Sequence, residues 1–231
     1  WMAAEFGETW GGVNLHLAAL IIITAGTFAF RQAFLAAFIP LGIGSLIGSG
    51  TQYWHASYGI FVKEALITII VFSILAAALY ALRLKMTQAA LRPWRIVAMI
   101  PARVSFFMVN FGFWVGSLWG DRPGEHFVQF ADYQERRAWQ ETAFEIHEAI
   151  FSIGWAGFLI ACIIMGLRMN NRFLSNTAIV FLSIHAYTQF YEFFGANGLT
   201  LLLGGVLLLG LSVGIFRFDR WQQRQEASDP A

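Results

Sequence analysis

Two sets of polar side chains in this sequence have the residue types and the spacing that chemistry inside a membrane requires. The first set is Glu141, Glu145, Glu148 and Ser152, and the second is His185, Gln189 and Glu192. Because both sets repeat at intervals of three or four residues, each predicts a polar stripe along one face of a helix. If the two stripes meet, their carboxylates and imidazoles can bind a divalent metal or relay protons.

The histidines and glutamates in and beside these stripes include candidate metal ligands. His147, Glu148 and His185 are the candidate ligands, and a divalent metal or haem is the candidate cofactor. The chain lacks His-x-x-x-His and Glu-x-x-His, which are the helical spacings typical of metal sites. Structural alternatives therefore stay open: hydrogen bonds between helices for Glu148 and His185, and a solvated helix start for Glu141 and Glu145.

A further stripe joins Arg103, Asn110 and Ser117, which lie seven residues apart. An arginine deep in a membrane is costly, so we expect the Arg103 side chain to extend to the membrane surface. A role in a substrate path or pore is the alternative. Asn110 is expected to hydrogen-bond a neighbouring helix.

The composition is that of a membrane protein. The 231 residues are 58% hydrophobic and only 13% charged, whereas soluble domains carry roughly 25% charged residues. The mean hydropathy is +0.59. A single cysteine, Cys162, excludes a disulfide framework. These values exclude most nucleic-acid-binding proteins and cytosolic enzymes, and they make the lipid bilayer the expected partner.

The apolar segments that can cross a bilayer predict an all-α, polytopic helix bundle in one membrane domain, residues 1–231. A span needs about 20 mostly apolar residues. Seven segments qualify: 13–30, 33–49, 60–82, 96–119, 144–167, 173–194 and 199–216. The one long connection, residues 120–143, is expected to form a helix on the outer membrane surface.

The charges divide between the two sides of this bundle. With the N-terminus outside and the C-terminus inside, ten of the 15 Lys and Arg residues fall on the inner side. This distribution obeys the positive-inside rule. All five histidines and eleven of the 14 acidic residues fall in the outer half. The predicted chemistry therefore lies at the outer face.

Small residues at four-residue spacing predict close helix packing. Gly44 and Gly48 form one such pair, and Gly210 and Gly214 form another. These faces can join helices of one chain, second copies of the chain, or membrane-protein partners.

Three stretches of the chain are specific in their aromatic and glycine pattern. They are ARVSFFMVNFGFWVGSLWGD from Ala102, IHAYTQFYEFFGANGLTLLLGGVLLLGL from Ile184 and YWHASYGIFVKEALITIIVFSILA from Tyr53. They resemble a group of bacterial multi-spanning inner-membrane proteins of unknown function, over about the last three quarters of the chain. The resemblance implies the bacterial cytoplasmic membrane, and it carries no catalytic motif or functional residue.

Three functions fit these observations. The first is non-enzymatic handling of a small solute, ion or proton by the polar groups in the outer half of the bundle. The second is a metal- or haem-dependent enzyme at the outer face, and the third is a structural or assembly subunit of a larger membrane complex. The polar stripes predicted within the spans favour the first.

Overall fold

The chain folds mainly into helices that form two compact units. The computed structural model describes residues 9–54, 57–86, 88 and 91–228, and the units are Trp1–Glu148 and Ala149–Ala231. His55, one of the five histidines, lies outside the described residues. Within the described part, four helices are long and apolar enough to cross a membrane: Ala65–Lys85, Arg92–Trp119, Glu148–Arg168 and Gly198–Trp221. The predicted helical membrane architecture is confirmed at this level.

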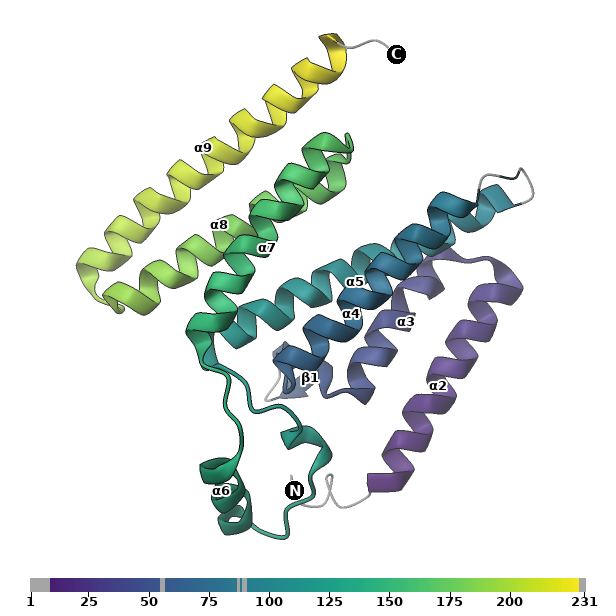
Figure 1. The fold of residues 1–231 in the computed structure, drawn as a ribbon, viewed down its shortest axis with the longest axis vertical. Coiled ribbons are helices and arrows are strands. Elements are labelled where there is room, and N and C mark those ends of the chain that lie inside the picture. The colour runs from purple at the N-terminus through teal and green to yellow at the C-terminus, as the bar shows by residue number, and fades with distance from the viewer. Residues whose placement is uncertain (1–8, 55–56, 87, 89–90, 229–231) are drawn as a thin grey trace. The chain divides into compact units, whose positions relative to one another are not determined.

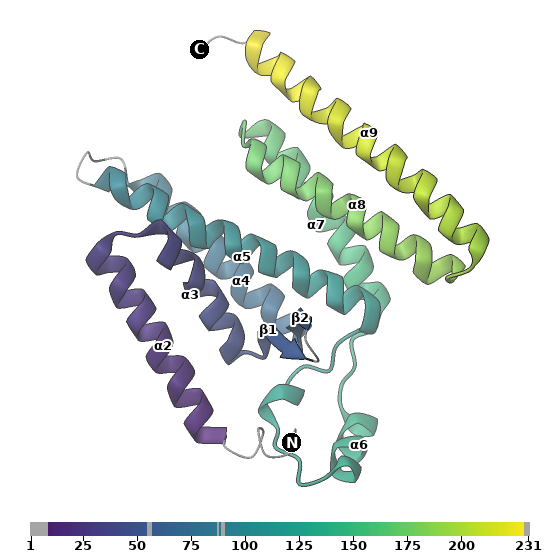
Figure 2. The same cartoon turned by 180° about the vertical axis from the view of Figure 1, so that it is seen from behind.

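The first unit is built mainly from four helices. They are α2 (Thr9–Phe30), α3 (Ala33–Leu46), α4 (Ala65–Lys85) and α5 (Arg92–Trp119). Both ribbon views show α4 and α5 running side by side (Figure 1, Figure 2). The two helices approach closely because Gly112 has no side chain: a Cβ atom there would lie 2.9 Å from Cγ1 of Ile69. The core is formed around α5, whose buried side chains include Val97, Phe106 and Val109.

A β-hairpin stands where the sequence predicted the ends of two spans. Strands β1 (Ser49–Trp54) and β2 (Ser57–Val62) pair antiparallel, with Ser49 opposite Val62. The predicted spans 33–49 and 60–82 are therefore wrong at these ends. Gly48 stops the first because its φ is +76°. The run Tyr58–Val62 is rich in aromatic and β-branched residues, which favour a strand.

The long connection folds partly into helix. It contains η2 (Glu125–Phe127) and α6 (Tyr133–Thr142), so the predicted helix is present. Asp132 caps α6 by accepting a hydrogen bond from the Glu135 backbone N–H at 2.8 Å. Asp121 and Ile146 then pair their backbones in an isolated bridge. This bridge delays the next helix, which begins at Glu148 instead of residue 144.

Helix α5 also differs from its predicted span. It begins at Arg92, four residues before the predicted start at 96, with Pro93 in its first turn. Pro101 consequently lies in the helix interior, not near its start. The hydroxyl of Ser105 donates to the Pro101 carbonyl at 2.7 Å.

Three helices build the second unit: α7 (Glu148–Arg168), α8 (Arg172–Phe194) and α9 (Gly198–Ser228). The side chain of Asn171 caps α8, and that of Asn197 accepts two backbone N–H groups at the start of α9. At the end of α8 and α9 away from Asn197, Arg172 of α8 donates to Asp219 of α9 at 2.9 Å. Helix α9 continues well past the predicted end at Phe216.

The predicted glycine pairs have different surroundings. A Cβ atom at Gly44 would lie 2.5 Å from the Ser49 carbonyl oxygen, so this glycine permits close packing. Gly48 lies after the helix and not on its face. Among the described residues, nothing lies within 4 Å of a Cβ atom added at Gly210 or Gly214.

Candidate functional site

Two buried acidic side chains meet the N-terminal end of α4. Glu64 precedes the helix and is fully buried, and Asp121 is 7% exposed. The Glu64 side chain makes no capping hydrogen bond to its own helix. Instead Oδ2 of Asp121 accepts the Leu66 backbone N–H at 2.7 Å. The carboxylate therefore satisfies one of the N–H groups that a helix start leaves without an internal partner, where the helix dipole also favours negative charge.

Glu64 binds the segment that follows Asp121. Its Oε2 accepts the Gly124 backbone N–H at 2.8 Å, and its Oε1 accepts the His126 backbone N–H at 2.6 Å. These charge-assisted bonds compensate for the removal of the carboxylate from water. They also join residues 60 and 62 positions apart in the chain. We call Glu64, Asp121 and His126 the carboxylate cluster.

Burial favours the neutral forms of Asp121 and His126. It raises the pKa of Asp121, and the nearby Glu64 charge raises it further, while backbone hydrogen bonds oppose the change. Burial also lowers the pKa of His126, and the Lys63 charge adds to this, while Glu64 opposes it. At neutral pH, His126 is therefore an uncharged imidazole. Asp121 takes up a proton more readily than a solvated carboxylate does.

The loop between α3 and β1 lies against His126. A Cβ atom at Gly48 would lie 2.8 Å from Cγ of the imidazole ring. Close by, the hydroxyls of Ser49 and Thr68 share a buried hydrogen bond of 2.6 Å. The Gly48 backbone and the hairpin thus help to exclude water from the cluster.

Gly48→Ala is expected to destabilise the protein by more than the about 1–2 kcal/mol typical of a left-handed non-glycine residue. The methyl group meets both the unfavourable φ of +76° and the His126 ring. Gly124→Ala is the matched control, because φ is +99° there but nothing lies within 4 Å of the added Cβ. Thermal unfolding in mild detergent measures both variants. Equal losses would contradict the contact with His126.

Ion pairs surround the cluster on its exposed side. Arg136 of α6 donates through Nε to Glu125 Oε1 at 2.8 Å, and Gln140 donates to the same oxygen at 3.0 Å. Arg122 pairs with Glu145 at 2.6 Å. These contacts hold α6 and the chain leading to α7 against the segment that contains His126, but exposed ion pairs contribute little free energy.

The predicted stripe of glutamates is wrong as a single helix face. Glu141 lies on α6, Glu145 lies in the connection that follows, and Glu148 begins α7. The backbone bridge at Ile146 interrupts the helix between them. Glu145 is exposed and pairs with Arg122, so the structure assigns it a structural contact.

The other predicted residues have varied environments. His147 is exposed, with its Nε2 at 3.6 Å from Glu148 Oε1. Asn110 is fully buried, and its side-chain amide donates to the Phe106 carbonyl of its own helix at 2.8 Å. Arg103 is half-buried and lines a pocket between α4 and α5.

The second unit contains three more of the predicted site residues. His185 is 7% exposed, and its ring packs edge-on against Trp155 with centroids 4.8 Å apart. Gln189 is half-buried and Glu192 is exposed on α8. The contact of His185 with Trp155 favours a packing role for this histidine.

Among the described residues, no three His, Cys, Asp or Glu side chains form a group that could hold a metal ion. His147 and Glu148 belong to the first unit and His185 to the second, so this ligand set stays a prediction. The carboxylate cluster was not predicted from the sequence, which favours a local ion pair with Lys63 or solvation for Glu64 and a surface position for His126. An acid immediately before an apolar run was the available signal.

Comparison with known proteins identifies no relative. No protein-family model, curated protein or solved structure matches the chain.

Proposed function

We propose that this chain is a polytopic integral membrane protein that handles protons or small cations through the carboxylate cluster. One observation carries the proposal: two acidic side chains, one fully buried and one 7% exposed, lie close together at the start of a membrane-length helix. A carboxylate near a second one in a poorly solvated place gains a proton or a cation readily. Such groups mark ion and proton pathways when they occur in membrane proteins.

Buried polar side chains on α5 support the proposal. Ser117, Asn110 and Ser105 are each at most 3% exposed, and they lie at increasing distance along α5 from the end that bears Asp121. Polar side chains are costly inside a membrane, so a buried series along a central helix favours a functional role. The sequence predicted ion handling by polar groups of α5, α7 and α8, and the proposal keeps α5 and adds Glu64 at the start of α4.

The proposal includes the full predicted topology: seven spans, the N-terminus outside and the C-terminus inside, in the bacterial cytoplasmic membrane. In this topology Glu64 and Asp121 face the outer side, and the ends of α4 and α5 that carry Arg83, Lys85, Arg92 and Arg95 face the inner side. The cluster then exchanges protons or cations with the outer compartment.

Asp121→Asn is expected to reduce proton flux by at least about tenfold, because the amide keeps an acceptor for the Leu66 N–H but cannot ionise. Proteoliposomes that enclose a pH-sensitive dye measure the flux after a pH jump. Glu141→Gln is the matched control, since Glu141 is exposed and also loses one charge. A wild-type protein without flux of protons or cations, or an unchanged Asp121→Asn variant, would contradict the proposal.

The same purified protein separates the alternatives. Visible absorption and bound metal would favour the haem- or metal-dependent enzyme. Proteins that co-purify in gentle detergent, together with an absence of flux, would favour the assembly subunit.

A further inference from the structure

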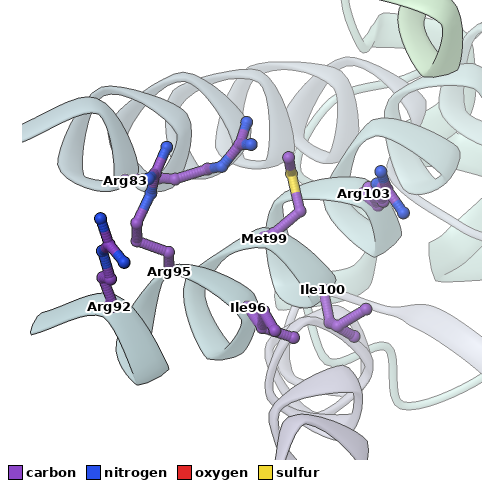
Figure 3. Close-up of a pocket in the computed structure, with 7 residues that line it drawn as sticks. All are labelled: Arg83, Arg92, Arg95, Ile96, Met99, Ile100 and Arg103. Carbon is purple, nitrogen blue, oxygen red and sulfur yellow. The ribbon is translucent and has the colours of Figure 1, made fainter. Parts of the chain in front are cut away.

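A pocket lined by arginines lies at the end of the first unit away from the carboxylate cluster. Its volume is about 580 Å³, and it opens between the last turns of α4 and the first turns of α5. Four arginines line it: Arg83 from α4, and Arg92, Arg95 and Arg103 from α5. Figure 3 shows the arginines of α5 on the side of that helix that faces Arg83.

The sequence explains why these side chains converge. Arg92, Arg95, Met99 and Arg103 are spaced by three, four and four residues, so they share one face of α5. Arg83 lies in the last turn of α4, the helix packed against that face. Helix packing thus gathers guanidinium groups that the sequence separates by as many as 20 residues.

The local sequence provides no carboxylate to balance these charges. Residues 65–120, which include both helices, contain no Asp or Glu. Like charges gathered in one pocket repel each other, most strongly where water is partly excluded. An anion bound between them removes this repulsion, so the pocket has the electrostatic character of an anion site.

The shape and chemistry of the lining favour a phosphate group. The planar guanidinium forks of arginine match phosphate oxygens and donate paired hydrogen bonds to them. Ile96, Met99 and Ile100 form the rest of the wall. An apolar surface beside a cationic one suits an amphiphile, in which a phosphate adjoins hydrocarbon.

The position of the pocket along the helices places it at headgroup depth. Helix α4 has 21 residues, and at about 1.5 Å per residue it matches the about 30 Å hydrocarbon thickness of a bilayer. Arg83 in its last turn therefore reaches the headgroup level. Trp94 lies at the same end, with Arg31 over its ring at 5.6 Å, and tryptophan is the residue typical of this interface.

We infer that the arginine pocket binds the phosphate headgroup of an acidic phospholipid. Pockets that gather Arg and Lys between membrane helices recognise such headgroups through these interactions. The inference is independent of the proposed ion handling, because the pocket and the carboxylate cluster lie at opposite ends of α4 and α5.

Native mass spectrometry of the protein with phosphatidylglycerol, with phosphatidylcholine or with inorganic phosphate tests the inference. We expect phosphatidylglycerol to bind at least tenfold more tightly than phosphatidylcholine. Inorganic phosphate at the same concentration should not displace it. Equal binding of the two lipids would overturn the inference. Displacement by inorganic phosphate would overturn it in favour of a soluble phosphate ligand.

Variants assign the binding to the pocket. Arg92→Gln with Arg95→Gln is expected to weaken phosphatidylglycerol binding at least tenfold. Arg217→Gln with Arg224→Gln on α9 removes the same charge from exposed positions and should leave binding unchanged. Met99→Trp fills the pocket without changing charge and should also reduce binding. Equal loss in the α9 control, or full binding in Met99→Trp and in the Arg92/Arg95 variant, would overturn the inference.

Discussion

Glu64→Ala is expected to lower the free energy of unfolding by about 2–5 kcal/mol, because it leaves two partly buried backbone N–H groups without their carboxylate acceptor. These are the N–H groups of Gly124 and His126, which bond the Glu64 carboxylate at 2.8 and 2.6 Å. Each such group costs about 1–3 kcal/mol when it stays buried and unsatisfied. Thermal unfolding in mild detergent, followed by circular dichroism, measures the loss.

Two further variants make this prediction specific. Glu64→Gln keeps one acceptor oxygen but turns a donor toward the second N–H, so we expect an intermediate loss. Glu141→Ala removes an exposed glutamate that forms an ion pair with Arg137 at 3.4 Å. It should change stability by no more than about 0.5 kcal/mol. A loss from Glu64→Ala no larger than that of Glu141→Ala would show that the carboxylate does not hold the segment.

Trp155→Ala is expected to cost about 3 kcal/mol, at the lower end of the range for a buried tryptophan. Trp155 is fully buried in the second unit and contacts the rings of His185 and Phe181, with centroids 4.8 and 6.4 Å apart. In a membrane the transfer of apolar surface contributes little, so most of the loss comes from packing. The unfolding midpoint in detergent measures it.

Matched variants separate packing from chemistry at this position. Ile153→Ala lies on the same helix but is 75% exposed, and it should have little effect. His185→Phe keeps an aromatic ring against Trp155 and should retain stability and ion flux. A His185→Phe variant that is stable but has lost flux would instead assign His185 a role in ion handling.

The extent of the helices was largely predictable, but their ends were not. Apolar runs of membrane length indicate helices because every backbone polar group must bond within its own segment when water is absent. At the ends this constraint is relaxed, and tertiary contacts decide. The apolar run of α4 extends back through Ile60, Phe61 and Val62, yet these residues pair with β1 in a hairpin. Residues 144–147 were predicted as helix, and the bridge from Ile146 to Asp121 prevents it.

The candidate site could not be derived from spacing along the chain. Helical periodicity brings together residues three or four apart, which is why it singled out Glu145, Glu148 and His185. The carboxylate cluster instead joins Glu64 to residues about 60 positions later. No local pattern specifies that pairing.

From the residues alone one can predict helices long and apolar enough to cross a membrane, with few ionisable groups in them. Hydropathy and charge act on each segment separately, so they can be read from the residues alone. Which of those groups are buried together depends on how the helices and loops pack. Packing of α5 against α4 gathers four arginines in one pocket, and closure of residues 121–127 over α4 buries Glu64. Both depend on contacts between distant parts of the chain, whose energies no single segment contains.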